Sequence, residues 1–470
     1  MTRGPVRLAA RLGASLGVRS GVAWLGLLAG VIGLAGPATA QDTPPRLAFD
    51  LGSSLAYDDN PGLAAAGSAG RLRFDASLGL NLNTTTRDQS FSLGLNGLAR
   101  LLPGDEAGLA DPSLTLAYAR QGANSTLSVQ GSLQQSEVDL FQPLIAADGT
   151  VSSTDILVTT GNITSRAATL TFATGLQAPL GFDLAATLND RLYSDTSDPD
   201  VHDSSSQSLQ AGVHLRLPDA GREISLNASL GASDFDNATQ TRRDTRSLGF
   251  GLAQTLRPGV TVQASLGQTT VTSEQIGVAD STSAGVTGQV GLDLVLARGT
   301  ASVALSSDRD ALGSRQSLRF SRALQLPNGT FSGDLGLNAR GGVQGGELIG
   351  NLSYAQKLAT GSVALTLSRQ VALNAEDQDV ANTTLGLSYQ HQINDLSSLG
   401  LSVSVLGTGG GPGVTEALRQ TLSVSYSRDL TADWQVTTGY QFRSLAPSGA
   451  DKTAANSIYV AISRKFVLRP

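Results

Sequence analysis

Apolar and polar residues alternate along extended segments of this chain. In the segment 71–83, every even position holds Leu, Phe or Ala, and every odd position holds Arg, Asp, Ser, Gly or Asn. Segments 182–189 and 224–233 show the same alternation. Successive side chains of a β-strand point to opposite faces, so each segment predicts a strand with one apolar and one polar or small-residue face. Runs of about ten residues or more exceed the usual soluble strand and match a tilted strand that crosses a bilayer.

The composition excludes several other classes of protein. Charged residues make up 15% of the chain, against about 25% in a typical soluble domain. The 54 glycines disfavour a helical fold, since each glycine in a helix costs about 1 kcal/mol relative to alanine. The absence of cysteine excludes a disulfide scaffold and a thiolate metal site. A glycine-rich, weakly charged, all-β protein remains.

The first forty residues have the layout of a secretory signal peptide. A segment with four arginines leads into the apolar run Gly21–Leu34, and Ala38–Ala40 offers a small-residue cleavage site. An uncleaved anchor is the alternative, but the run is shorter than the roughly 20 residues of a membrane-spanning helix. We therefore predict a signal peptide over residues 1–40 and a single exported barrel domain over residues 41–470. Without the four arginines, 29 basic residues face 39 acidic ones, a net charge of −10, which argues against nucleic acid as a partner.

Two kinds of connection alternate between the segments. Tight turns rich in Gly, Pro, Asn and Asp are expected at Thr84–Arg87, Ala178–Gly181, Asp219–Arg222, Arg257–Gly259, Arg298–Thr300, Pro327–Gly329, Ala359–Gly361, Asn394–Ser397 and Thr431–Asp433. Longer polar loops are expected at Asp58–Gly70, Asp139–Asn162, Asp195–Asp203, Asp236–Asp244, Asn374–Asp379, Gly407–Thr415 and Ala446–Ala454. Outer-membrane barrels have short periplasmic turns and long extracellular loops. The sequence therefore predicts an all-β, transmembrane, antiparallel up-and-down outer-membrane β-barrel of about 22 strands (roughly 18 to 24), from Arg46 to Phe466.

A barrel of this size must enclose a lumen. Eight strands can fill their interior with side chains, but about 22 strands cannot. About five residues separate Gln41 from the first strand, so we expect no N-terminal plug. We expect instead that a loop folds inward, and Asp139–Asn162 is the candidate because it contains the apolar run Leu140–Ile145. The alternative is that this apolar run packs on the barrel rim.

Charged residues on the polar faces are candidates for a filter in the lumen. Arg71, Arg73 and Asp75 lie on one face of one strand, opposite its leucines. Because the leucines are expected to face lipid, these three residues should face water. They are our candidates for a local charge filter.

The three histidines do not indicate a catalytic site. His214 lies on a polar strand face, but no G-x-S-x-G motif accompanies it, so a lumen-lining role is favoured over a Ser–His–Asn arrangement. His391 lies beside a turn, where a solvated role suffices. His202 and the carboxylates of Asp195–Asp203 could hold Ca²⁺, but their spacing does not fit an EF-hand loop. We predict no catalytic residues, no metal, no cofactor and no enzymatic activity.

Two motifs resemble a known family. The segment Leu55–Pro61, at the end of the first predicted strand, is similar to the opening of the beta-barrel porin family, which includes outer-membrane proteins linked to exopolysaccharide export. The closing strand Ser457–Phe466 resembles a terminal barrel strand that ends in Phe, the usual outer-membrane assembly signal, although four residues follow Phe466 here. The resemblance implies a passive outer-membrane channel or barrel.

The leading functional hypothesis is a porin-like barrel in the cell outer membrane. It would pass solutes by size- and charge-filtered diffusion, with an association with polysaccharide export that the resemblance suggests. Its partners would be outer-membrane lipid, the outer-membrane assembly machinery, and small solutes or polysaccharide. The alternatives are a non-conducting structural or surface-interaction barrel and a secreted β-solenoid adhesin, in which connections of one kind would repeat at a fixed period.

Overall fold

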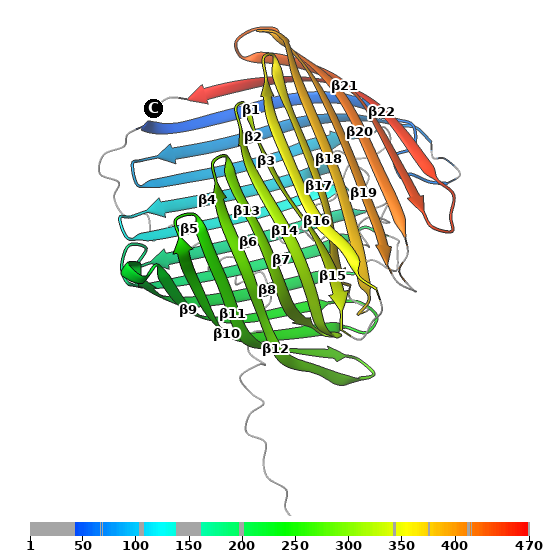
Figure 1. Cartoon of the computed structure of the whole chain (residues 1–470). Coiled ribbons are helices and arrows are strands. Elements are labelled where there is room, and N and C mark those ends of the chain that lie inside the picture. The colour runs from blue at the N-terminus through cyan, green and yellow to red at the C-terminus, as the bar shows by residue number, and fades with distance from the viewer. Residues whose placement is uncertain are drawn as a thin grey trace, which may run out of the picture.

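The computed structural model is a single closed β-barrel of 22 antiparallel strands (Figure 1). It describes residues 43–65, 67, 69–102, 108–137, 161–196, 202–341, 345–374, 377–410, 414 and 416–468. The strands are β1 (Thr43–Asp58), β2 (Arg71–Thr85), β3 (Gln89–Leu101), β4 (Gly108–Gln121), β5 (Ser125–Glu137), β6 (Asn162–Thr174), β7 (Leu180–Ser194), β8 (Ser204–Leu217), β9 (Arg222–Phe235), β10 (Thr241–Arg257), β11 (Val260–Gln275), β12 (Val278–Leu296), β13 (Gly299–Asp310), β14 (Gly313–Leu326), β15 (Gly329–Arg340), β16 (Glu347–Leu358), β17 (Gly361–Leu373), β18 (Asp379–Asn394), β19 (Ser397–Gly410), β20 (Ala417–Asp429), β21 (Trp434–Pro447) and β22 (Thr453–Leu468).

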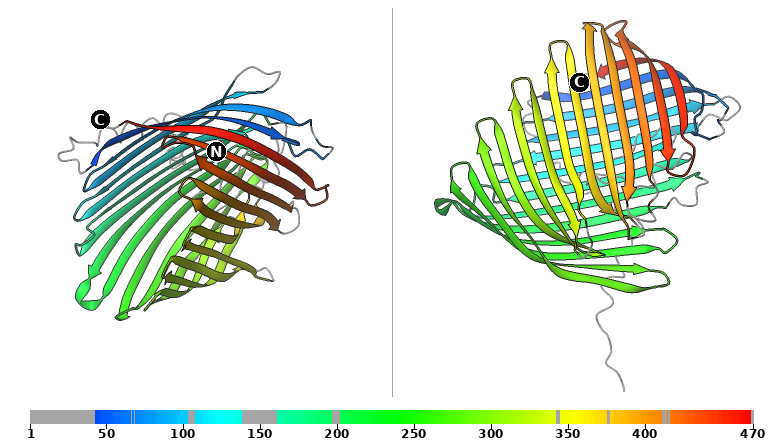
Figure 2. Two further views of the ribbon diagram at one scale, coloured as in Figure 1. Left: turned by 90° about the horizontal axis from the view of Figure 1, so that it is seen from above. Right: turned by 45° about the vertical axis from the view of Figure 1, so that its right-hand side comes forward.

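Each strand pairs with the strands before and after it in sequence, and β1 pairs with β22 to close the barrel. That closing register runs from Leu47 opposite Leu468 to Asp58 opposite Ser457. Figure 2 shows the first and last strands, in blue and red, side by side. The predicted fold class and the strand number of 22 are confirmed. The alternative of a β-solenoid is wrong, because the coils of a solenoid would not form antiparallel hairpins that close into a barrel.

The alternation in the sequence separates the two faces of the wall. Large apolar side chains at alternate positions are exposed on the outside, among them Leu78 (57% exposed), Leu266 (65%) and Leu335 (58%). Polar and small residues between them face the interior. Such an apolar outer surface requires lipid, because a soluble protein rarely exposes contiguous apolar patches of this extent.

The barrel has two different rims. At the rim that we call the turn rim, all nine predicted tight turns join successive strands. In the turn between β10 and β11, Gly259 has a φ of +80°, which glycine adopts without strain. The described ends of the chain, Thr43 and Leu468, lie at this same rim, as an even number of hairpin-connected strands requires. Because short turns are periplasmic in outer-membrane barrels, this is the rim that the sequence predicts to be periplasmic.

The opposite rim, which we call the loop rim, carries the predicted longer loops. The expectation that every connection here is long is wrong at two places. Ile276–Gly277 joins β11 to β12, and Ala311–Leu312 joins β13 to β14. Gly277 has a φ of +81°, which allows a two-residue turn at the first of these places.

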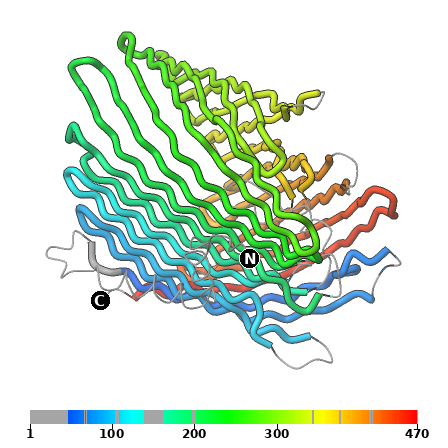
Figure 3. The backbone as a smooth tube through the Cα atoms, turned by 90° about the horizontal axis from the view of Figure 1, so that it is seen from below, coloured from blue at the N-terminus to red at the C-terminus, as the bar shows by residue number. Residues whose placement is uncertain are grey.

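All strands tilt in the same sense, so those of the two walls cross at a wide angle in Figure 1. Seen from below in Figure 3, the blue-to-green strands form one broad wall, and the yellow and orange strands form the wall behind it. Among the described residues, no helix is long and apolar enough to cross a bilayer.

Candidate functional site at the loop rim

The predicted filter residues form part of a larger ion cluster on β2–β5. Arg73 Nε lies 2.9 Å from Asp75 Oδ2, and Asp75 Oδ1 lies 2.9 Å from Arg100 Nε. Arg100 also contacts Asp111 at 2.8 Å and Glu137 at 2.6 Å. Asp75 and Arg100 are buried in the wall. Arg71 joins the same cluster, because its Nη2 lies 3.6 Å from Glu137 Oε2. The structure therefore brings the three predicted residues together.

A β-bulge places Asp111 in this cluster. The pairing of β3 with β4 shifts between Asn96 and Leu98, where β4 carries the extra residue, and Asp111 there has a φ of +47°. A bulge of this kind re-aims a side chain. Sequence reasoning missed Arg100, Asp111 and Glu137; the Asp111–Pro112 pair is the one local signal, because proline inside a strand marks a bulge or an edge.

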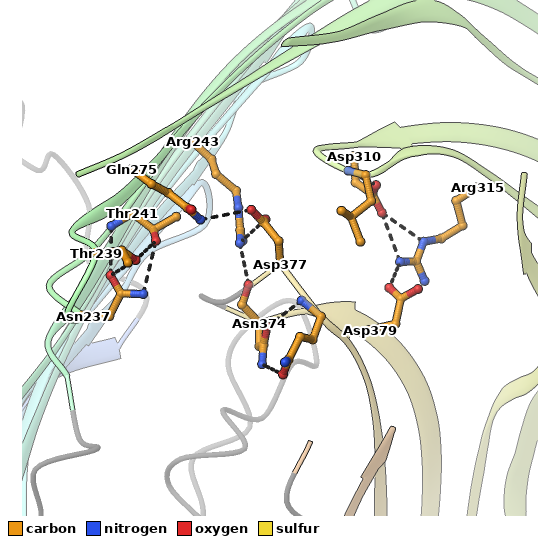
Figure 4. Close-up of polar contacts among 12 residues, drawn as sticks. Asn237, Thr239, Thr241, Arg243, Gln275, Asp310, Arg315, Asn374, Asp377 and Asp379 are labelled. Atoms are coloured by element: carbon orange, nitrogen blue, oxygen red, sulfur yellow. Dashed lines mark hydrogen bonds and ion pairs between the residues drawn. The ribbon is translucent and has the colours of Figure 1, made fainter. Parts of the chain in front are cut away.

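The loop that joins β17 to β18 reaches into the lumen. We call its described residues Asn374, Asp377 and Gln378 the strut. Arg243 Nη2 on β10 donates to the Asn374 carbonyl oxygen at 2.5 Å and to Asp377 Oδ1 at 2.6 Å. Gln275 Nε2 on β11 donates to Asp377 Oδ2 at 3.1 Å. Six strands, β11–β16, separate β10 from β17 along the wall, so the contact spans the interior instead of following the sheet (Figure 4).

The strut is held in shape by its own hydrogen bonds. Asn374 Oδ1 accepts from the Gln378 backbone N–H at 2.8 Å, and the two side-chain amides meet at 3.1 Å. Asp377 has a φ of +56°, an uncommon conformation that Asp tolerates better than most residues. On the far wall, Phe235 supports the guanidinium of Arg243, whose carbon lies 5.2 Å from the ring centre.

The other end of this loop is fixed by a compact ion cluster. Arg340 on β15 contacts both oxygens of Asp310 at 2.7 and 2.9 Å and both oxygens of Asp379 at 2.7 and 2.9 Å. Arg315 on β14 contacts Asp310 at 3.0 Å and also contacts Asp379. Bidentate arginine–carboxylate pairs of this kind are among the stronger polar contacts in proteins.

Asp377 and Asp379 therefore bind two different parts of the wall. Asp377 is tied to β10 and β11, whereas Asp379, two residues later, is tied to β14 and β15. Figure 4 shows the strut between these two groups of contacts. The described residues of the loop therefore connect β10 and β11 with β14 and β15 at the loop rim.

A second loop packs against the inner face of the wall at the loop rim. Leu63, between β1 and β2, is 4% exposed and packs in an apolar cluster with Leu406, Ala417, Leu445 and Ala455. Asn60 anchors the loop by donating to the carbonyl oxygens of Ala64 and Ala454 at 3.1 and 3.0 Å. Beneath the loop, Asp58 is paired with Arg443, which is 3% exposed.

Asp59 fastens this loop to β22. The backbone N–H of Asn456 donates to Asp59 Oδ1 at 2.6 Å, and its side-chain amide donates to Oδ2 at 2.8 Å. These two hydrogen bonds, that of the backbone first, hold the pKa of Asp59 below its usual value, because they favour the charged carboxylate.

The loop that we predicted to constrict the lumen, Asp139–Asn162, lies outside the described residues apart from its last two. The described residues of two other loops, Asp58–Gly70 and Asn374–Asp379, contact the inner side of the wall. We predicted both as loops from their polar composition. Their inward course depends on partners on distant strands, which the local sequence does not specify.

A charged network lies at the turn rim. His214 on β8 contacts Glu223 through Nδ1 at 2.9 Å and Asp183 through Nε2. Arg216 also contacts Glu223, at 3.2 Å. Both ring nitrogens of His214 therefore face carboxylates, which leaves neither for a serine hydroxyl, so the Ser–His–Asn arrangement is not formed.

The other histidines take part in local contacts. His391 lies 3.3 Å from Thr360 Oγ1 and stacks on Tyr389. In the loop that contains His202, Asp195 accepts from Asn162 and Asp203 accepts from the Tyr193 backbone, while residues 197–201 lie outside the described part. Within the described residues, no group of three or more His, Asp or Glu could hold a metal ion.

Solved structures with a similar fold are outer-membrane receptors and transporters. The iron transporter FrpB of Neisseria meningitidis matches with a TM-score of 0.54 at 8% identity, over 90% of this chain and 82% of that one. The ferric-catecholate import receptor Fiu of E. coli K12 matches with a TM-score of 0.53 at 11% identity, over 91% and 82%. No protein-family model and no curated protein matches the sequence. At these identities the likeness shows the fold: a 22-strand barrel of the outer-membrane type.

Proposed function

We propose that this protein is an outer-membrane channel that passes small hydrophilic solutes passively, filtered by size and charge. It would reach the membrane after export directed by the predicted signal peptide, residues 1–40. The observation that carries the proposal is the strut. A loop tied to two parts of the wall by Asp377 and Asp379 supports the proposal, because it would narrow an interior that is otherwise lined by polar side chains.

Physical size supports a hydrated interior. A barrel of 22 strands is too wide for its inward side chains to fill. Here many of the inward positions hold Ser, Thr, Asn or Gly. All described strands belong to the wall. The apolar outer surface faces lipid, so water and solutes would occupy the other side of the same wall.

The charge filter belongs to this proposal. The cluster of Arg71, Arg73, Arg100, Asp75, Asp111 and Glu137 is balanced in formal charge. Its exposure is uneven, because the side chains of Arg71, Glu137 and Asp111 are 29%, 26% and 23% exposed. Those of Arg73, Asp75 and Arg100 are 17%, 9% and 5% exposed. A passing ion would therefore meet Arg71 together with the two carboxylates Asp111 and Glu137. The acidic loops at the same rim would disfavour anions at low ionic strength.

The names of the structural neighbours support transport only in general terms. FrpB is named an iron transporter, and Fiu is named a ferric-catecholate import receptor; neither is named an enzyme. The association with polysaccharide export rests on the family resemblance of the motif Leu55–Pro61.

A non-conducting barrel is the second candidate. The observation in its favour is that the strut and the Leu63 loop both occupy interior space at the same rim. Such a barrel would serve structure or surface contact and would not pass ions.

Conductance in planar lipid bilayers separates the two candidates. The mature protein, purified in detergent and added at low concentration, should produce stepwise current increases. Mobility in gel electrophoresis with and without boiling is the control, because it reports whether the barrel is folded. A folded barrel that gives no current steps at any voltage would refute the channel and favour the structural role.

A further inference from the structure

A polar cavity of about 260 Å³ lies in the inner wall of β12–β15. Its lining includes Gln289 on β12, Asp308 on β13, Ser317 on β14 and Asn338 on β15. Arg315 also lines it, and the same side chain binds Asp379 at the base of the strut. The cavity therefore lies next to the base of the strut.

The lining offers many hydrogen-bonding groups. Ser306 Oγ lies 2.8 Å from Ser317 Oγ and 3.3 Å from Asp308 Oδ2, which forms a short polar ridge on the wall. Among the described residues, the side-chain amides of Gln289 and Asn338 have no hydrogen-bond partner. Each amide has two donors and a carbonyl acceptor, so both can bind a solute that also donates and accepts.

The charge of the surroundings excludes a strong anion site. Arg315 is paired with Asp310 and Asp379, and Arg319 is paired with Asp334 at 2.8 Å. Both guanidinium charges in the lining are thus already balanced by carboxylates. Asp308 is a further acidic group in the lining. An anion entering the cavity would meet a carboxylate without an uncompensated cation.

We propose that this cavity binds a neutral, multiply hydroxylated solute, such as one sugar ring. Hydroxyl groups both donate and accept, which matches the serine, amide and carboxylate groups of the lining. The cavity is smaller than the roughly 300 Å³ at the lower end of small-molecule pockets, so it has room for about one ring. The inference deepens the proposed channel by giving its solute class, and it rests on that function only for the route by which the solute arrives.

Ligand-detected NMR with glucose tests the binding directly. The refolded full chain in detergent micelles should bind glucose saturably, in the millimolar range or tighter. Gln289→Ala combined with Asn338→Ala should weaken binding about tenfold, because two groups that hydrogen-bond the sugar are removed while every ion pair stays. The matched control is Gln130→Ala combined with Gln210→Ala, on the inner faces of β5 and β8, which should change the affinity less than about twofold.

A second variant protects the test against misfolding. Ser317→Leu fills the cavity without touching an ion pair and should also abolish saturable glucose binding, while heat-dependent gel mobility confirms the folded barrel. Absence of saturable binding to the unsubstituted chain would overturn the proposal. So would equal weakening in the control pair, or displacement of glucose by inorganic phosphate, which would show an anion site.

The glucose-binding experiment and the conductance experiment can fail independently of each other. Glucose binding without any current in planar bilayers would refute the proposed channel and support the sugar site. Current steps in a protein that does not bind glucose would refute the sugar site and support the proposed channel.

Discussion

The two rims of the barrel are built by different kinds of contact. At the loop rim, Arg243 and Asp377 are 134 residues apart in sequence, and Arg443 and Asp58 are 385 apart. At the turn rim, His214 and Glu223 are nine residues apart, on two strands of one hairpin. Long-range contacts require the barrel to close first, whereas hairpin contacts form with their own turn. The loops of the loop rim should therefore vary with less effect on the wall than the hairpins of the turn rim.

This difference assigns separate roles to the rims. The strut and the Leu63 loop lie over the lumen and add little to the ladder of strand pairing. Changes at the loop rim should alter permeation first. Changes at the turn rim should alter assembly and stability first.

The largest expected effect comes from releasing the strut. Asp377→Ala removes the contacts to Arg243 and Gln275, so the loop loses its attachment to β10 and β11. We expect single-channel conductance to rise by about twofold or more, since conductance depends on the narrowest section of a pore. Asp293→Ala is the matched control, because Asp293 contacts Gln263 within the wall. Equal conductance of the two variants would show that the strut does not restrict the lumen.

A smaller effect is expected at the base of the strut. Arg340→Met removes four contacts to Asp310 and Asp379 and leaves Arg315 as the only cation that the structure shows between the two carboxylates. We expect the free energy of unfolding to fall by about 1–3 kcal/mol, measured by urea titration in detergent. For comparison, Arg319→Met removes one contact from a side chain that is 36% exposed, and we expect at most about 1 kcal/mol. A larger loss for Arg319→Met than for Arg340→Met would contradict this ranking.

The charge filter should give a moderate change in selectivity. Arg71→Glu combined with Arg73→Glu replaces the two exposed cations of the cluster with anions. We expect the reversal potential under a salt gradient to shift toward cation preference, and more at low salt than at high salt because exposed charges are screened. An unchanged reversal potential would show that these two residues do not act as a charge filter. His214→Ala at the turn rim is the comparison and should shift the potential less.

The smallest effect concerns the pH dependence of the Leu63 loop. The pKa of Asp59 is lowered by its hydrogen bonds from Asn456. Its contribution to loop stability is therefore complete above the ordinary Asp pKa and is lost as the pH falls through the lowered value. Limited proteolysis with an acid protease should cut the loop only below the usual Asp range, and Asp59→Ala should extend cleavage to higher pH. Cleavage that begins above that range in the unsubstituted chain would contradict the contact.

The wall could be predicted from the sequence because its signal is local. Segment 71–83 specifies two faces by itself, and turn residues such as Pro258–Gly259 mark the hairpins. Strand number and closure followed from counting these local units. Two-residue turns at the loop rim, such as Ile276–Gly277, were missed because neighbouring strands continue through them with little change in composition.

The site could be predicted only in part. The shared face of Arg71, Arg73 and Asp75 follows from their spacing of two, but Arg100 and Glu137 come from other strands. The partnership of Asp377 with Arg243 depends on the curvature of a closed barrel, which no local pattern encodes. The bulge at Asp111 likewise depends on a register that forms only when β3 and β4 pair.

Thiol labelling along β14 is the most direct test of the central claim that one face of each strand meets water and the other meets lipid. The chain contains no cysteine, so single-cysteine variants report one position each. Cysteine in place of Ser317, Arg319 and Ser321 should react with a membrane-impermeant thiol reagent in vesicles, whereas cysteine in place of Leu318 and Phe320 should stay protected. Uniform reactivity along the strand, or reactivity of the apolar set alone, would contradict a water-filled barrel.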